Sequence, residues 1–86
     1  MKDSKLIEFP QPESVVAAAE HVQSALESRS IAIGAAKGII YSLIGTLGSL
    51  IGDPDLPNHL LSGYQDALEL AYEVQAKIQA HEQSSK

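Results

Sequence analysis

The chain has 86 residues, of which six are basic and eleven acidic, so its net charge is −5, and it contains no cysteine. Disulfides and thiolate metal sites are therefore excluded, and the absence of Lys/Arg clusters disfavours nucleic acid and anionic lipid as partners. At this length we expect a single domain with a marginal core. Small chains without disulfides or structural metals commonly enlarge such a core by self-association.

Residues 1–11 show no helical periodicity and lead into a Pro-Gln-Pro segment at residues 10–12. Two prolines in alternation prevent a helix from passing through them, so residues 1–11 are predicted as an extended or disordered tail. Leu6, Ile7 and Phe9 are too few for the apolar core of a signal peptide, which makes the cytoplasm the expected location. These three side chains could fold over the domain or dock on a partner.

The segment from residue 13 to residue 28 has the pattern of an amphipathic helix. Pro12 suits the first position of a helix, and apolar residues then recur at steps of three and four. The apolar face consists of Val15, Ala18, Ala19, Val22, Ala25 and Leu26. Glu13, Glu20 and Glu27 recur every seven residues on the opposite face.

Residues 31–51 contain one charge, Lys37, and four glycines. Each glycine costs a helix about 1 kcal/mol relative to alanine, yet the spacing favours a helix over a strand, which would need a period of two. Small residues at steps of three and four line one side, and large aliphatic residues cover the other. The small residues, here called the small-residue strip, are Ala35, Gly38, Ser42, Gly45, Ser49 and Gly52.

Two interpretations of this apolar helix place it in a soluble protein. A helix that is apolar on all sides must be surrounded, so it could be a core helix between the two amphipathic ones. Alternatively, small residues permit close approach of two helix backbones, so the strip could meet the same strip of a second copy. On the second interpretation the interface residues are Ala35, Gly38, Tyr41, Ser42, Gly45 and Ser49.

A third interpretation places the same helix in a membrane. The segment is long enough to span a bilayer at about 20 residues. However, the cost of Lys37, together with the glycines and serines, offsets most of the gain from nine Ile and Leu residues. A membrane is therefore the less favoured environment.

A turn at residues 52–57, which contains two prolines, separates this segment from a last helix predicted over residues 56–80. Asp55 is the expected N-cap of that helix, and Pro57 is expected in its first turn. Residues 83–86 are predicted to be disordered. Residues 12–82 thus form one domain with helices at about 13–28, 31–51 and 56–80.

No motif in the sequence indicates catalysis. His21, His59 and His81 lack the spacing of a metal or general-base site, and Asp53 and Asp55 lack the further oxygen ligands of a calcium loop. We therefore expect no catalytic residue, no metal and no cofactor.

The sequence thus predicts an all-α protein, an antiparallel three-helix bundle with an apolar, glycine-rich central helix that self-associates. Its expected role is protein–protein interaction as a small regulator or adaptor, with itself as partner and another protein as a further option. The alternatives are a membrane-associated protein that uses residues 31–52 and a binder of a small apolar ligand between the helices.

Overall fold

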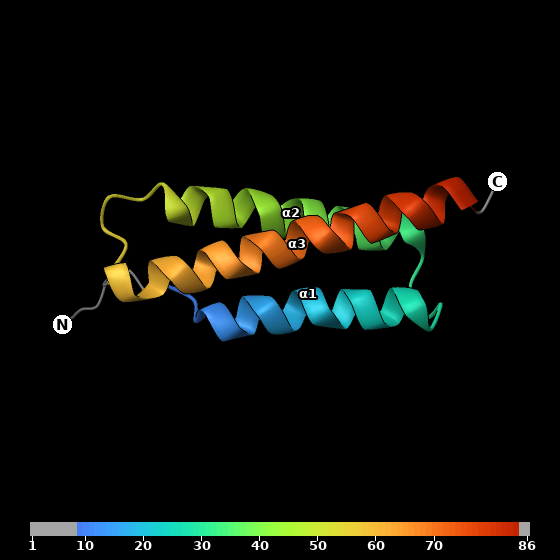
Figure 1. Cartoon of the computed structure of the whole chain (residues 1–86), viewed down its shortest axis with the longest axis horizontal. Coiled ribbons are helices and arrows are strands. Elements are labelled where there is room, and N and C mark those ends of the chain that lie inside the picture. The colour runs from blue at the N-terminus through green and yellow to red at the C-terminus, as the bar shows by residue number, and fades with distance from the viewer. Residues whose placement is uncertain (1–8, 85–86) are drawn as a thin grey trace.

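The computed structural model describes residues 9–84, and this part of the chain consists of three helices packed against one another (Figure 1). Helix α1 spans Pro12–Glu27, α2 spans Ile33–Ile51 and α3 spans Asn58–Ser84. No strand occurs within residues 9–84, so the predicted all-helical class is confirmed. In Figure 1, α1 and α3 run from left to right along the long axis and α2 runs from right to left.

The core lies between the three helices and divides into two clusters along the axis. One cluster joins the second half of α1, the first half of α2 and the last turns of α3. Its buried members are Ala19, Val22, Leu26, Ala36, Ile40, Val74 and Ile78. The other cluster, at the opposite end, contains Val15, Leu47, Leu60, Tyr64 and Ala67. No polar or charged residue of residues 9–84 is among the fully buried ones.

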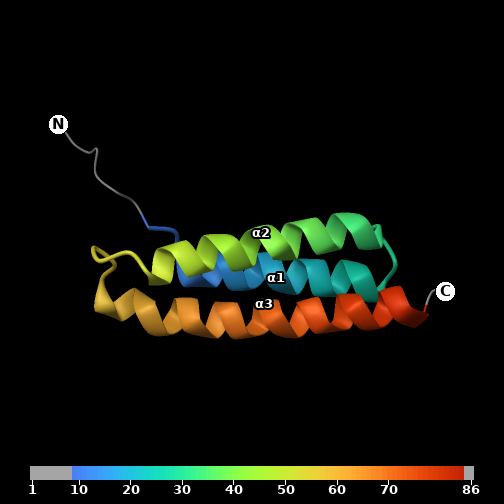
Figure 2. The same ribbon diagram turned by 90° about the horizontal axis from the view of Figure 1, so that it is seen from above.

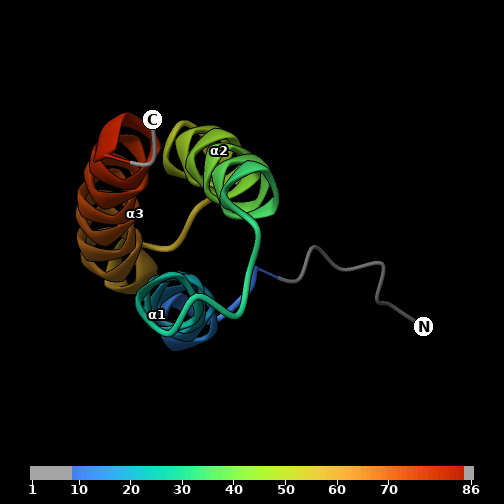
Figure 3. The ribbon, with the colours of Figure 1, turned by 90° about the vertical axis from the view of Figure 1, so that its right-hand side faces the viewer.

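Helix α3, and not α2, occupies the middle of the bundle. It packs extensively against both other helices, whereas α1 and α2 contact each other least (Figures 2 and 3). Only Ala36, Ile40 and Leu47 of α2 are buried. The interpretation of residues 31–51 as a core helix enclosed by two others is therefore wrong. The two neighbours cover the side of α2 that carries Ile40 and Leu47, and the side with the small residues stays outside the bundle, as do Ile39 and Tyr41.

Helix α1 ends without a glycine. The backbone N–H of Ser30 donates to the Ala25 carbonyl at 2.9 Å, and that of Arg29 donates to the Leu26 carbonyl at 3.2 Å. This is the pattern of a Schellman motif, which needs a left-handed residue just past the helix. Arg29 takes that conformation, with φ of 61°. The two-residue difference between the predicted start of the second helix and Ile33 follows from this turn.

The start of α3 is fixed by contacts with the segment before α1. The Tyr64 hydroxyl donates a hydrogen bond to the Pro10 carbonyl, and Phe9 packs against the same cluster as Tyr64. Gly63 lies so close to Pro12 that a Cβ atom there would be 2.7 Å from the proline ring. Phe9 therefore folds onto the domain, as one of the two alternatives expected, while Leu6 and Ile7 lie outside the described residues.

Two predicted boundaries need correction. Helix α3 begins at Asn58, so Asp55 is not its N-cap and Pro57 precedes the helix. Asp53 orders the preceding loop, because its Oδ1 accepts the backbone N–H of Asp55 at 2.9 Å. Residues 83 and 84, predicted to be disordered, belong to α3. Residues 85–86 and the tail residues 1–8 lie outside the described part of the chain.

Candidate interaction surface

The six residues predicted for an interface all lie on the outer side of α2. Ala35, Gly38, Tyr41, Ser42, Gly45 and Ser49 are each exposed. They share one face because helical residues three and four apart are neighbours. The large residues Ile40 and Leu47 point the opposite way, into the core. The structure therefore brings the predicted residues together on a surface that no other part of residues 9–84 buries.

The glycines of α2 face open space. A Cβ atom added at Gly34, Gly38, Gly45 or Gly48 would meet nothing within 4 Å. Each of these positions also lies inside a regular helix, where a side chain is favoured over glycine. Nothing within residues 9–84 therefore requires a missing side chain at any of the four.

A groove runs between α2 and α3 beside two of these glycines, Gly34 and Gly38. It has a volume of about 340 Å³ and is lined by Gly34, Lys37, Gly38, Ile40, Tyr41, Gln75, Ile78 and Gln79. Ile40 and Ile78 are buried and form an apolar floor, and the two glutamines supply amide groups from α3. Tyr41, on the groove's edge, is 75% exposed, the largest exposed fraction among the large hydrophobic residues described.

The sequence pattern did not predict that Gln75 and Gln79 of α3 would line this groove. Gln75 and Gln79 stand at the i,i+4 spacing that places side chains on one helix face, and the exposed Tyr72 is their neighbour on that face. The spacing indicates that the two glutamines share a helix face. It does not indicate that this face lies beside Tyr41, because that depends on how α2 and α3 are rotated relative to each other.

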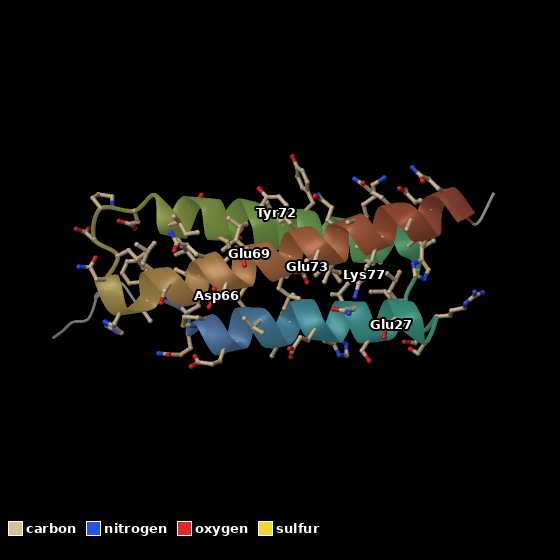
Figure 4. All side chains as sticks on the ribbon, in the orientation of Figure 1. Glu27, Asp66, Glu69, Tyr72, Glu73 and Lys77 are labelled. Carbon is tan, nitrogen blue, oxygen red and sulfur yellow. The ribbon has the colours of Figure 1, made fainter. Side chains whose placement is uncertain are left out.

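Charge is separated between the sides of the bundle. Helix α2 carries no acidic residue, and its only charge, Lys37, forms an ion pair with Glu82 of α3 at 2.8 Å. On α3, Asp66, Glu73 and Lys77 lie along the side that faces α1, and Tyr72 lies toward α2 (Figure 4). Helix α2 itself thus carries no acidic residue, and Glu82 is the acidic residue of α3 that pairs with it.

A second groove, between α1 and the start of α3, has the opposite character. It has a volume of about 420 Å³, and Glu13, Glu20 and Asp66 contribute three carboxylates to its lining. Among residues 9–84, however, no group of three or more His, Cys, Asp and Glu side chains could hold a metal ion. The groove is an acidic surface feature.

The three histidines lie far apart, His21 on α1 and His59 and His81 near opposite ends of α3. His21 is exposed on α1, His59 is exposed in the first turn of α3, and the Nδ1 of His81 lies 3.0 Å from the Lys77 carbonyl of the same helix. Burial raises the pKa of Tyr64 above its ordinary value of 10.0, so this phenol stays protonated and keeps its hydrogen bond to Pro10.

Comparison with known proteins gives no match: no family model, no curated protein and no solved structure matches this chain. One helix within residues 9–84, Ile33–Ile51, is long and apolar enough to cross a membrane by length and composition. The core helix of a soluble protein can meet the same criterion, but little of α2 is buried here, so its uncharged outer face requires a separate explanation.

Proposed function

We propose that this protein is a small helical interaction protein that self-associates through the outer face of α2 and acts as a regulator or adaptor. In this proposal the chain is an antiparallel three-helix bundle, works in the cytoplasm and performs no catalysis. The meeting surface consists of Ala35, Gly38, Tyr41, Ser42, Gly45 and Ser49.

The observation that carries the proposal is the open space beyond the four glycines of α2. Glycine in the middle of a helix is less stable than alanine by roughly 0.5–1 kcal/mol, so Gly38, Gly45 and Gly48, which lie beyond the first turn, together cost about 1.5–3 kcal/mol. That is a large part of the roughly 5–15 kcal/mol by which a domain is stable. No contact within residues 9–84 accounts for this cost. Close approach by a helix of another molecule would account for it, because glycine lets two backbones come together.

The charge distribution supports a second copy as the partner. Two molecules of net charge −5 repel, and repulsion is strongest where their acidic residues would face each other. The outer face of α2 is free of acidic residues, so two copies can approach through it without opposing carboxylates.

The deciding experiment is the molar mass in solution, measured by light scattering and analytical ultracentrifugation over a range of concentrations. We expect the wild-type chain to be a dimer or larger at micromolar concentration and Gly45→Leu to be shifted toward monomer. The introduced leucine side chain has room in the single chain, so the helical content should be unchanged. Ala17→Leu, at an exposed position of α1, is the matched control. A monomeric wild type, or a Gly45→Leu variant of unchanged mass, would contradict the proposal.

Association with a membrane is the second candidate, favoured by the apolar length of Ile33–Ile51 and its small buried fraction. In this case the outer face of α2 would lie against lipid instead of a second copy. Flotation with neutral phosphatidylcholine vesicles separates the two candidates. A chain that floats and resists a carbonate wash supports the membrane, and a chain that stays in the soluble fraction as a dimer supports self-association.

A further inference from the structure

We propose that, in the dimer, the Tyr41 side chain of each copy inserts into the groove between α2 and α3 of the other copy. This inference rests on the proposed self-association and adds its geometry. It also assigns a role to Gln75, Ile78 and Gln79 of α3, which the sequence pattern of α2 alone does not include.

The groove matches the chemistry of a tyrosine side chain. A phenol needs an apolar surface for its ring and a hydrogen-bonding partner for its hydroxyl once it is buried. The buried residues Ile40 and Ile78 provide the apolar floor, and the amides of Gln75 and Gln79 can donate to or accept from the hydroxyl. The volume of about 340 Å³ exceeds that of one tyrosine side chain. Gly34 and Gly38 leave the entrance clear, since neither position carries a side chain.

The Tyr41 side chain is free to contact another molecule. Its side chain is 75% exposed, and no hydrogen bond of its hydroxyl is seen among the described residues. It stands about one helical turn from Gly38 and about two from Gly34, on the same side of α2. A two-fold axis across α2 between residues 38 and 41 would therefore set Tyr41 of each copy over Gly38 of the other. An interface of this kind uses the same patch twice, as two-fold dimers do.

The size of the surface suits a second copy. Helix α2 is about 28 Å long, and two packed helices present a width of about 20 Å. The joint face therefore covers roughly 560 Å² on each copy, or about 1,100 Å² in total, which exceeds the roughly 1,000 Å² that a specific interface should bury. Because the ion pair between Lys37 and Glu82 balances the two charges at the edge of this face, a second copy meets no net charge there.

The test uses two variants that remove opposite halves of the contact. Tyr41→Ala lacks the inserted side chain and one edge of the groove but keeps its floor and its α3 side, whereas Gly38→Leu keeps Tyr41 and fills the groove. Both positions are exposed, so each variant should retain the fold. We expect each variant alone to dimerise about tenfold or more weakly than the wild type, since aromatic anchors in pockets dominate interface energetics.

Mixing the two variants should restore one of the two contacts. In the heterodimer, Tyr41 of the Gly38→Leu chain can enter the open groove of the Tyr41→Ala chain. Native mass spectrometry of an equimolar mixture should therefore show the heterodimer well above the statistical share of one half. A mixture of Tyr41→Ala with Ala17→Leu is the control, and in it no such preference is expected.

The possible outcomes separate this inference from the proposed function. A heterodimer at its statistical share, in a protein whose wild type is dimeric, would overturn the Tyr41 contact and leave self-association standing. Unchanged dimerisation of both single variants would do the same. A wild type that is monomeric at all concentrations tested would overturn both, and the groove would then be open to a small ligand or another protein.

Discussion

The first turns of α3 and the outer face of α2 both contain glycine, but in contrasting surroundings. At Gly63 a Cβ atom would be 2.7 Å from the ring of Pro12, so the absence of a side chain allows α1 to begin against α3. At Gly34, Gly38, Gly45 and Gly48 a Cβ atom would meet nothing within 4 Å. The end of α1 sharpens the contrast, because Arg29 has a positive φ, the backbone conformation in which glycine is favoured, and yet is not glycine.

This contrast separates a glycine that serves the fold from one that does not. The contact of Gly63 with Pro12 explains its identity from within the single chain. The glycines of α2 have no such explanation, although each weakens the helix that contains it. The proposed function offers a reason for them, a second copy that approaches α2 from outside. Four substitutions test whether this contrast is real.

Gly63→Ala should destabilise the protein by about 1–2 kcal/mol. The added methyl group would overpack against the rigid ring of Pro12, which typically costs about 1–3 kcal/mol, and the higher helix propensity of alanine offsets part of this. Urea denaturation followed by circular dichroism measures the change. Ser62→Ala, at the neighbouring exposed position, is the control and should have little effect. A Gly63→Ala variant as stable as the wild type would show that the contact with Pro12 does not require glycine at this position.

Tyr64→Phe should lower the free energy of unfolding by about 1 kcal/mol at neutral pH, because it removes the hydrogen bond to the Pro10 carbonyl. Burial raises the pKa of Tyr64 above 10.0, so the folded state keeps a proton that the unfolded state loses as the pH rises. The contribution of Tyr64 is thus complete below pH 10 and is lost as the pH rises through the raised pKa.

The same denaturation measurement, repeated from about pH 7 to about pH 11, checks this prediction on both sides of the ordinary tyrosine pKa. The difference between wild type and Tyr64→Phe should shrink in the alkaline range. Tyr72→Phe, at an exposed position, should differ little from wild type at neutral pH. A difference between wild type and Tyr64→Phe that grows in the alkaline range would mean that the phenol is not held protonated by the fold.

Arg29→Gly should stabilise the protein by up to about 1 kcal/mol, because glycine adopts the left-handed conformation after α1 without the strain of a Cβ atom. Thermal unfolding by calorimetry would show a rise in Tm. Arg29→Ala is the matched control, since alanine removes the charge and keeps the Cβ atom. If alanine stabilised as much as glycine, the effect would come from the charge, and the backbone conformation would carry no cost.

Much of this fold could be predicted from the sequence. Prolines and glycine punctuate the chain near the observed helix ends, and the spacing of apolar residues set the inward faces of all three helices, such as Ile40 and Leu47 on α2. The end of α1 was predicted at residue 28, one residue past Glu27, but the left-handed conformation of Arg29 was not, because that residue is not a glycine. The central position of α3 was also not predicted, because periodicity indicates the face that each helix buries but not which helix lies between the others.

The candidate surface could be predicted in part for the same reason. The small-residue strip follows from spacing along one helix, and five of its six members share an exposed face of α2, whereas Gly52 lies just past the end of that helix. Whether that face pointed into the bundle or away from it depended on which side of α2 the other helices cover. The groove depends further on the rotation of α3, which brings Gln75 and Gln79 beside Tyr41. No pattern within a single helix encodes that relation.

Gly48→Ala should raise the stability of the single chain by roughly 0.5–1 kcal/mol, because alanine favours the helix and its methyl group meets open space. The effect should therefore be opposite in sign to that of Gly63→Ala. Denaturation at a concentration low enough to keep the chain monomeric isolates this gain, and ultracentrifugation at higher concentration measures association separately. A variant that is more stable when dilute and associates more weakly when concentrated would indicate that glycine at position 48 serves contact between molecules. If it were less stable even when dilute, an unseen contact within the chain would require the glycine, and α2 would no longer differ from the start of α3.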